Sequence, residues 1–288
     1  MEKYYYYAGV EVTVSIPVAA IYKEERHLET FRVEAVENPH RFEFEAVESL
    51  EAPVGHLVAN LPDMRIYRDE EKEIRYLGFS SESWEKAYLR VENIGKQHRV
   101  CYAKSYFPEK IVSRTVLNCM GAEHLIARAG GFVFHCSYIE RDGEAILFTA
   151  PSGTGKSTQA DLWHEYRGAE IINGDRAAVR IVDGKVMAEG IPFAGSSAYC
   201  KNRSLPIRAI VYLGQAKETS IRKLRGYEAF SRIWEGVSVN TWDKVDMEMV
   251  SAAVQEVAQQ VGVFHMPCRP DESAVIALED ALRKLEQK

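Results

Sequence analysis

Residues 145–158 read AILFTAPSGTGKST, which is the strongest structural signal in the sequence. The apolar run Ala145 to Phe148 predicts a buried strand, and the segment from Lys156 to about Tyr166 predicts a helix. The loop between them ends in Gly155-Lys156-Ser157 and matches a phosphate-binding loop, except that Ala150 replaces its first glycine. A chance Gly-Lys-Ser turn is the weaker interpretation, because a strand and a helix flank the loop in the required order.

A phosphate-binding loop predicts a nucleoside triphosphate, taken as ATP, together with Mg²⁺. Backbone N–H groups wrap the phosphates, the Lys156 ammonium neutralises their charge, and the Ser157 hydroxyl binds the metal. The predicted nucleotide-binding residues are Pro151, Ser152, Gly153, Thr154, Gly155, Lys156, Ser157 and Thr158.

A carboxylate follows the next predicted strand, where Ile171 and Ile172 precede Asn173-Gly174-Asp175. Phosphoryl transfer needs a carboxylate that holds Mg²⁺ or accepts the proton of an attacking hydroxyl. Asp175 is therefore predicted as a catalytic residue and, with Ser157, as a metal ligand. The competing interpretation is an aspartate that only closes a turn after Asn-Gly. The strand Ala209 to Leu213 ends in Gly214, where an ordinary ATPase would place its acid.

Two Asp-Gly pairs predict tight hairpin turns. Asp142-Gly143 joins strands expected at Phe132 to Ile139 and Glu144 to Thr149, and Asp183-Gly184 joins a second pair. His135 lies on the strand that pairs with the one entering the phosphate-binding loop. It is predicted as a third catalytic residue, an acid, base or metal ligand near the phosphates, with a purely structural histidine as the alternative.

The segment Phe193 to Arg203 contains Gly195-Ser196-Ser197 and two cations, Lys201 and Arg203. It predicts a mobile loop that brings positive charge to the transferred phosphoryl group, or else a solvated basic loop.

The predicted secondary structure changes near residue 110, from mostly strands to a mixture of helices and strands. Residues 1–110 are predicted to be a strand-rich region of unknown role, and residues 111–288 a kinase-like nucleotide-binding domain, although one continuous domain is also open. A helix is expected from Ser113 to Ala129, because Val116, Leu117, Met120 and Leu125 fall near one face and Gly130-Gly131 would end it. Apolar residues at helical spacing, such as Val250, Val254 and Val257, predict core-facing helices in the C-terminal third.

Composition narrows the classes of partner. The formal net charge of −6 argues against a broad basic face for nucleic acid, although local basic patches are open. Its five cysteines are widely spaced and form no Cys-x-x-Cys pair, which favours reduced thiols. The N-terminus lacks the apolar core of a signal peptide, and no apolar run is long enough to span a membrane. A cytoplasmic protein without a membrane or nucleic-acid partner is expected, and a homo-oligomer is left open.

Taken together, Val133-Phe134-His135-Cys136, the phosphate-binding loop and Asn173-Gly174-Asp175-Arg176 resemble the HPr kinase/phosphorylase family, which is related in fold to ATP-dependent phosphoenolpyruvate carboxykinase. The resemblance covers about residues 130 to 215. It implies an α/β (α+β) fold, in which a P-loop core with a mixed sheet and flanking helices follows the strand-rich N-terminal half. It also implies active-site roles for His135, Lys156, Ser157 and Asp175.

The family's pair of aspartates is incomplete here, because Gly174 stands in place of the first. One carboxylate must then cover both tasks or be assisted by another residue, which disfavours reverse phosphorylase activity. The resemblance does not extend to the family's substrate-binding segment, so its small carrier protein is not assigned as the substrate.

Three functions follow for testing. The first is an ATP-dependent kinase that phosphorylates a hydroxyl, for example a serine of a protein or peptide. The second is a nucleotide-binding regulatory or scaffold protein without turnover, which Gly174 makes credible. The third is carboxykinase-like chemistry on a small carboxylic acid, which would require further metal ligands and an arginine-lined anion pocket.

Overall fold

The structure is a computed structural model that describes residues 2–17, 26–70, 72–78, 83–106, 113–195 and 197–286. The chain separates into two compact units, Met1–Gly121 and Ala122–Lys288. This division falls somewhat later than the 110/111 boundary expected from the sequence. Within the described residues, both units contain a large mixed sheet, and helices flank the sheet of the second unit.

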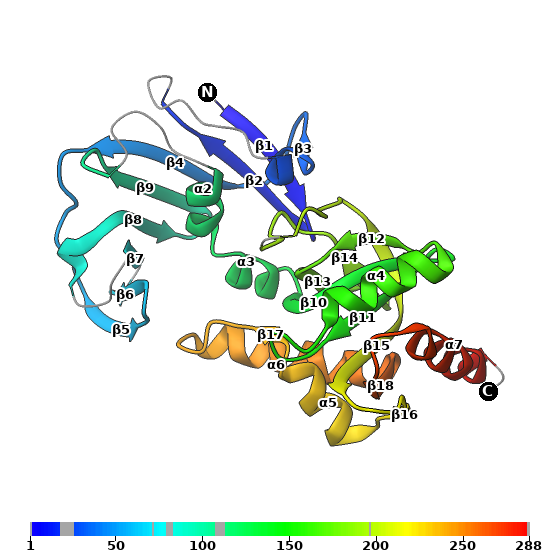
Figure 1. Ribbon diagram of the computed structural model, residues 1–288. Helices are drawn as coiled ribbons and strands as arrows, with labels where there is room; N and C mark the ends of the chain where they lie inside the picture. The colour runs from blue at the N-terminus through cyan, green and yellow to red at the C-terminus, as the bar shows by residue number, and fades with distance from the viewer. Residues whose placement is uncertain are drawn as a thin grey trace. The chain divides into compact units, whose positions relative to one another are not determined.

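The first unit is built on one sheet whose described strands follow the order β3-β1-β2-β4-β9-β8-β7-β6-β5 (blue through cyan to blue-green in Figure 1). Neighbours are antiparallel except that β4 runs parallel to both β2 and β9. The alternation expected of a half-buried strand is clear in β4, where Phe42 and Phe44 are buried and Glu43 is exposed. The strands are β1 (Glu2–Tyr7), β2 (Val10–Ser15), β3 (Arg32–Val33), β4 (His40–Val47), β5 (His56–Asn60), β6 (Met64–Arg68), β7 (Glu73–Gly78), β8 (Ala87–Ile94) and β9 (Gln97–Ala103), with the short helices α1 (Arg26–Glu29) and η1 (Trp84–Lys86).

The single helix predicted from Ser113 to Ala129 is wrong. The structure has two helices, α2 (Ser113–Met120) and α3 (Ala122–Arg128), separated at Gly121. Gly121 has a φ of +59°, a conformation that breaks an α-helix and that favours glycine. A Cβ at this position would also collide with the Arg75 guanidinium. The apolar periodicity continues through the break, which is why the sequence pattern suggested one helix.

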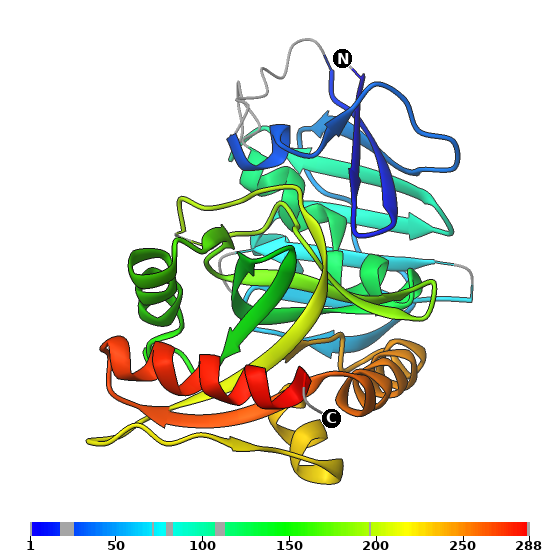
Figure 2. The same cartoon turned by 90° about the vertical axis from the view of Figure 1, so that its right-hand side faces the viewer.

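The second unit has a sheet ordered β11-β10-β13-β14-β15-β18-β16, with β12 and β17 also pairing with β10 (Figure 2). Strands β11, β15 and β18 are parallel, so that Thr149, Tyr212 and His265 lie level with one another near their carboxyl ends. The elements are α3, β10 (Gly131–Arg141), β11 (Glu144–Thr149), α4 (Lys156–Arg167), β12 (Glu170–Asn173), β13 (Arg176–Val182), β14 (Lys185–Glu189), β15 (Ser204–Gln215), β16 (Arg222–Lys223), α5 (Gly226–Trp234), β17 (Val237–Ser238), α6 (Lys244–Gln260), β18 (Gly262–Cys268) and α7 (Glu272–Glu286).

Both predicted hairpins are confirmed. Asp142 and Gly143 have φ values of +54° and +80°, and Asp183 and Gly184 have values of +50° and +75°. Two consecutive positive φ angles characterise the two-residue turn whose twist matches that of paired strands. The first hairpin aligns Cys136 on β10 with Thr149 on β11, directly before the loop that leads into α4.

Two apolar cores lie against the two faces of this sheet. On one face, α4 contributes Trp163 and α7 contributes Leu278, and Figure 2 shows α7 (red) lying along β18 (orange). On the other face α3, α5 and α6 pack, and the predicted stripe of Val250, Val254 and Val257 is fully buried. The loop after β11 is thus anchored by a strand and a helix that are each fixed by core packing.

The cysteines Cys101, Cys119, Cys136, Cys200 and Cys268 are all buried and unbridged. Burial disfavours the thiolate, which raises the pKa of Cys200 to about 12 and raises that of the other four thiols as well. None of the described helices is long and apolar enough to cross a membrane.

Candidate functional site

The loop between β11 and α4, residues 150–155, is shaped by glycines. Gly153 and Gly155 have backbone φ values of +78° and +109°, which residues other than glycine rarely adopt. Gly155 is also the N-cap of α4 and has no side chain to accept hydrogen bonds from the helix. The first amides of α4 therefore lack a side-chain cap, and an anion is the partner that a helix N-terminus favours.

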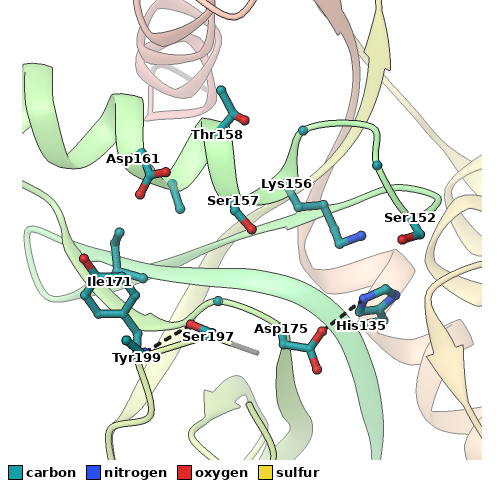
Figure 3. A pocket seen from close by; sticks show the side chains of 15 residues that line it. His135, Ser152, Lys156, Ser157, Thr158, Asp161, Ile171, Asp175, Ser197 and Tyr199 are labelled. Carbon is teal, nitrogen blue, oxygen red and sulfur yellow. Dashed lines mark hydrogen bonds and ion pairs between the residues drawn. The ribbon is translucent and has the colours of Figure 1, made fainter. Parts of the chain in front are cut away.

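A cavity of about 540 Å³ opens beside this loop (Figure 3). Six of the predicted loop residues and both predicted catalytic partners, His135 and Asp175, line it. Pro151 and Thr154 belong to the loop but are not among the lining residues. The lining residues are His135, Ser152, Gly153, Gly155, Lys156, Ser157, Thr158, Ala160, Asp161, Ile171, Gly174, Asp175, Ser197, Ala198 and Tyr199.

The Lys156 side chain is mostly buried, with 8% of the residue exposed. Its ammonium donates a hydrogen bond of 3.0 Å to the Ala150 carbonyl, which folds the side chain over its own loop. Burial lowers the pKa of Lys156, and the negative charge of Asp175 offsets part of that effect. A poorly solvated ammonium beside uncapped amides attracts an anion more strongly than a solvated one does.

Asp175 and His135 form a pair across the cavity wall. The distance from His135 Nε2 to Asp175 Oδ1 is 3.4 Å, and Arg176 Nε donates to Asp175 Oδ2 at 3.2 Å. The hydrogen bond from His135 is the main cause that lowers the pKa of Asp175, and the charge of Arg176 adds to it against the opposing effect of burial. The geometry follows from β10, where Phe134 and Cys136 point into one core and His135 projects from the opposite face.

Asn173 is a site residue that the sequence did not single out. Its side chain is fully buried, and its Oδ1 accepts the backbone N–H groups of Asp175 and Arg176 at 2.9 and 3.0 Å. Its Nδ2 donates to the carbonyls of Ile191 and Phe193 at 3.4 and 3.2 Å. One amide thus fixes both the turn that presents Asp175 and the segment that leads to Ser197. Asparagine is common at such turns because its side chain accepts hydrogen bonds from the backbone that follows. This preference is the feature of the sequence that indicates Asn173.

Gly174 and the segment around Ser197 are packed against each other. A Cβ on Gly174 would lie 2.9 Å from the Ser197 Cβ and still nearer to its hydroxyl oxygen. Conversely, Gly195 has a φ of +55°, and a Cβ there would lie 2.8 Å from the Asp175 carboxyl. Any side chain at position 174 would therefore meet Ser197, and the two glycines permit this close approach.

No family model matches the chain, and no curated protein matches it. Among solved structures, the Hpr(Ser) kinase/phosphatase from Coxiella burnetii is similar with a TM-score of 0.34 and 11% sequence identity, over 54% of this chain and 93% of that chain. We therefore infer function from the residues of the cavity themselves.

The basic residues predicted for the Phe193 to Arg203 loop do not reach the cavity. Lys201 pairs with Glu170 and Arg203 pairs with Glu140, and neither cation is among the lining residues. Carboxylates on β12 and β10 neutralise them instead. From this segment Ser197, Ala198 and Tyr199 line the cavity, and Ser196 lies outside the described residues.

The predicted metal ligands Ser157 and Asp175 line one cavity, together with Asp161. Hydroxyl and carboxylate oxygens are the donors that Mg²⁺ prefers, so Ser157 and Asp175 fit the ion. A separate group, His124, Asp243 and Asp246, is close enough to hold a metal. However, the buried Asp246 already accepts hydrogen bonds from His124 at 2.8 Å and Arg128 at 3.0 Å, so this group links α3 to α6.

The contact between Gly174 and Ser197 can be tested by substitution. Gly174→Ala should lower the free energy of unfolding by roughly 1–3 kcal/mol, because the added methyl group has no room. Ser197→Gly in the same chain should recover most of that loss, since it removes the colliding atoms. Urea denaturation of the two single variants and the double variant measures both effects. Additive losses in the double variant would contradict the packing described for this turn.

Proposed function

We propose that the second unit binds a Mg²⁺-nucleoside triphosphate at the loop 150–155 and transfers its terminal phosphoryl group to a hydroxyl, in the manner of an HPr-kinase-like enzyme. One observation supports this most: the Lys156 ammonium, the uncapped N-terminus of α4 and the Asp175–His135 pair face the same cavity. The ammonium and the helix N-terminus attract phosphates, and the Asp175–His135 pair can accept or donate a proton. We take the nucleotide to be ATP and the compartment to be the cytoplasm.

The loop amides and Lys156 would hold the β- and γ-phosphates, with Lys156 exchanging the Ala150 carbonyl for a phosphate oxygen. Ser157 and Asp175 would hold Mg²⁺. When bound, this ion would neutralise the negative charge that develops on the phosphates. Because phosphoryl transfer depends mainly on position and electrostatics, rigid anchoring of the loop by β11 and α4 contributes directly to rate.

Asp175 would orient the acceptor hydroxyl. The hydroxyl oxygen attacks the terminal phosphorus, the bond from that phosphorus to the leaving diphosphate oxygen breaks, and the hydroxyl proton passes to the Asp175 carboxylate. A lowered pKa keeps Asp175 ionised, which favours orientation and metal binding over strong basicity. His135 would hold the carboxylate in place through its ring nitrogen.

The acceptor is proposed as a hydroxyl, for example a serine of a protein or peptide. Binding without turnover is the second candidate, because Ser197 fills the space beside Gly174 where another acid would stand. Carboxykinase-like chemistry is less favoured. Among the described lining residues the basic groups are Lys156 and His135, without the arginines that grip a dicarboxylate.

Isothermal titration with Mg-ATP, followed by transfer of labelled terminal phosphate to serine-containing peptides, tests this function. We expect ATP to bind only with Mg²⁺ present and a labelled peptide to form. Tight binding without a labelled product across the peptides would indicate the scaffold function. ATP consumption that depends on oxaloacetate would indicate the carboxykinase-like reaction, and absence of binding would overturn the proposal.

A further inference from the structure

A second and larger cavity, of about 880 Å³, lies away from the loop 150–155. It is lined by the β16–α5 segment, the C-terminal end of α6 and residues at the amino ends of β15 and β18, such as Arg208 and Gly262. The loop 150–155 instead follows the carboxyl end of β11, which runs parallel to β15. The two cavities therefore lie toward opposite ends of the parallel strands.

Two cations in this second cavity have no partner among the described residues. Lys223 and Arg225 are exposed, and neither side chain forms a hydrogen bond or an ion pair there. Their neighbours are paired, since Arg222 binds Glu228 and Arg208 binds Glu144. No aspartate or glutamate is among the lining residues. The wall is thus positively charged in a chain whose formal net charge is −6, and it complements an anionic partner.

The rest of the lining combines apolar and aromatic side chains with three uncharged polar ones, Gln255, Gln259 and Gln260. Tyr227 is 83% exposed, an unusual position for a large aromatic side chain, and it lines the cavity together with these cations and Phe230. Leu224, Val261 and Leu285 contribute further apolar surface. Exposed aromatic residues flanked by cations are typical of sites that bind another polypeptide.

We propose that this cavity docks an acidic polypeptide segment with apolar side chains, supplied by the phosphoryl acceptor. The inference rests on the proposed function, and it assigns acceptor recognition to a surface remote from the transfer site. A free phosphate would leave the apolar wall uncovered, because the cavity is much larger than that ion. Nucleic acid fits poorly, since its phosphate backbone requires many cations and this wall offers two unpaired ones.

Binding of a fluorescein-labelled peptide, composed of Asp and Glu with interspersed Leu, tests the proposal by fluorescence anisotropy at low ionic strength. The full chain should bind this peptide and bind a Lys-for-acid version much less. Lys223→Glu with Arg225→Glu should weaken binding about tenfold or more, and Tyr227→Ser should weaken it several-fold. The matched control is Lys185→Glu with Lys244→Glu, two exposed lysines outside the cavity, which should bind as the unchanged chain does.

Mg-ATP affinity, measured on the same variants, should stay unchanged, so failure of docking and failure of nucleotide binding are separable. The proposal is overturned by equal binding of the acidic and basic peptides, or by full binding to the Lys223→Glu/Arg225→Glu variant. It is also overturned if inorganic tripolyphosphate displaces the peptide while Tyr227→Ser has no effect, because that result describes a small-anion site. Preferred binding of a labelled oligonucleotide would overturn it in favour of nucleic acid.

Discussion

Replacing Lys156 with methionine is expected to lower phosphoryl transfer by about 10²- to 10³-fold, the usual cost of removing one preorganised charge from a transition state. Methionine has a similar length and retains contacts of the buried stem, so the loop should keep its course. The affinity for Mg-ATP should fall as well, since the ammonium neutralises bound phosphates before and during transfer. Single-turnover transfer and calorimetric titration measure the two losses separately.

The same substitution should not destabilise the protein. Because burial lowers the pKa of Lys156, its charged form is less favourable in the folded state than in the unfolded state. This cost is present at neutral pH, declines as pH rises through the lowered folded pKa, and is gone above the unfolded value of 10.5. Methionine removes the cost, so the free energy of unfolding at pH 7 should be equal or higher. A marked loss of stability would show that the bond to Ala150 holds the loop together.

Replacing Asp175 with asparagine is expected to lower transfer by about 10²- to 10⁴-fold, the range attributed to a positioned acid or base. Asparagine keeps the shape but cannot accept a proton or neutralise a metal ion. Binding of ATP without Mg²⁺ should change little, because Lys156 and the loop amides remain. Asp161→Asn is the matched control, since Asp161 lines the same cavity on α4, and its effect should be much smaller. Equal losses from both variants would contradict the role given to Asp175.

Stability should report on Asp175 through its pH dependence. Its folded pKa lies below the ordinary value of 3.8, so its bonds to His135 and Arg176 stabilise the protein above that pH. The stabilisation is lost as pH falls from 3.8 through the folded pKa. The difference in unfolding free energy between the original chain and Asp175→Asn should therefore shrink on acidification. A difference that stays constant would show that Asp175 gains nothing from its neighbours.

The sequence predicted local features of the second unit well, because each depends on a few adjacent residues. Asp142-Gly143 and Asp183-Gly184 require a specific turn, and the apolar run before Lys156 requires a strand. The helix α5 was not predicted. Its nine residues, with Gly226 at the start, are too short for a clear period, and its formation depends on packing of Ala229 and Ile233 against α6.

The candidate site was predictable where its members are close in sequence or end neighbouring strands. Lys156 belongs to a contiguous loop motif, Asp175 follows a strand, and His135 lies on the strand paired with the one entering the loop; all three line one cavity. The contact of Ser197 with Gly174 depends on the path of the chain after Phe193, which no local pattern specifies. The structure of the first unit likewise depends on strand pairs distant in sequence, such as β4 with β9, so periodicity showed its strands but not their order.

The buried thiols have a practical consequence. Since all five native cysteines are shielded and their raised pKa values disfavour thiolate, maleimide dyes should leave the folded chain essentially unlabelled. A cysteine introduced at the exposed position of Tyr227 would then be the single reactive handle on the surface. A fluorophore attached there could follow peptide arrival in real time, without prior removal of any native thiol.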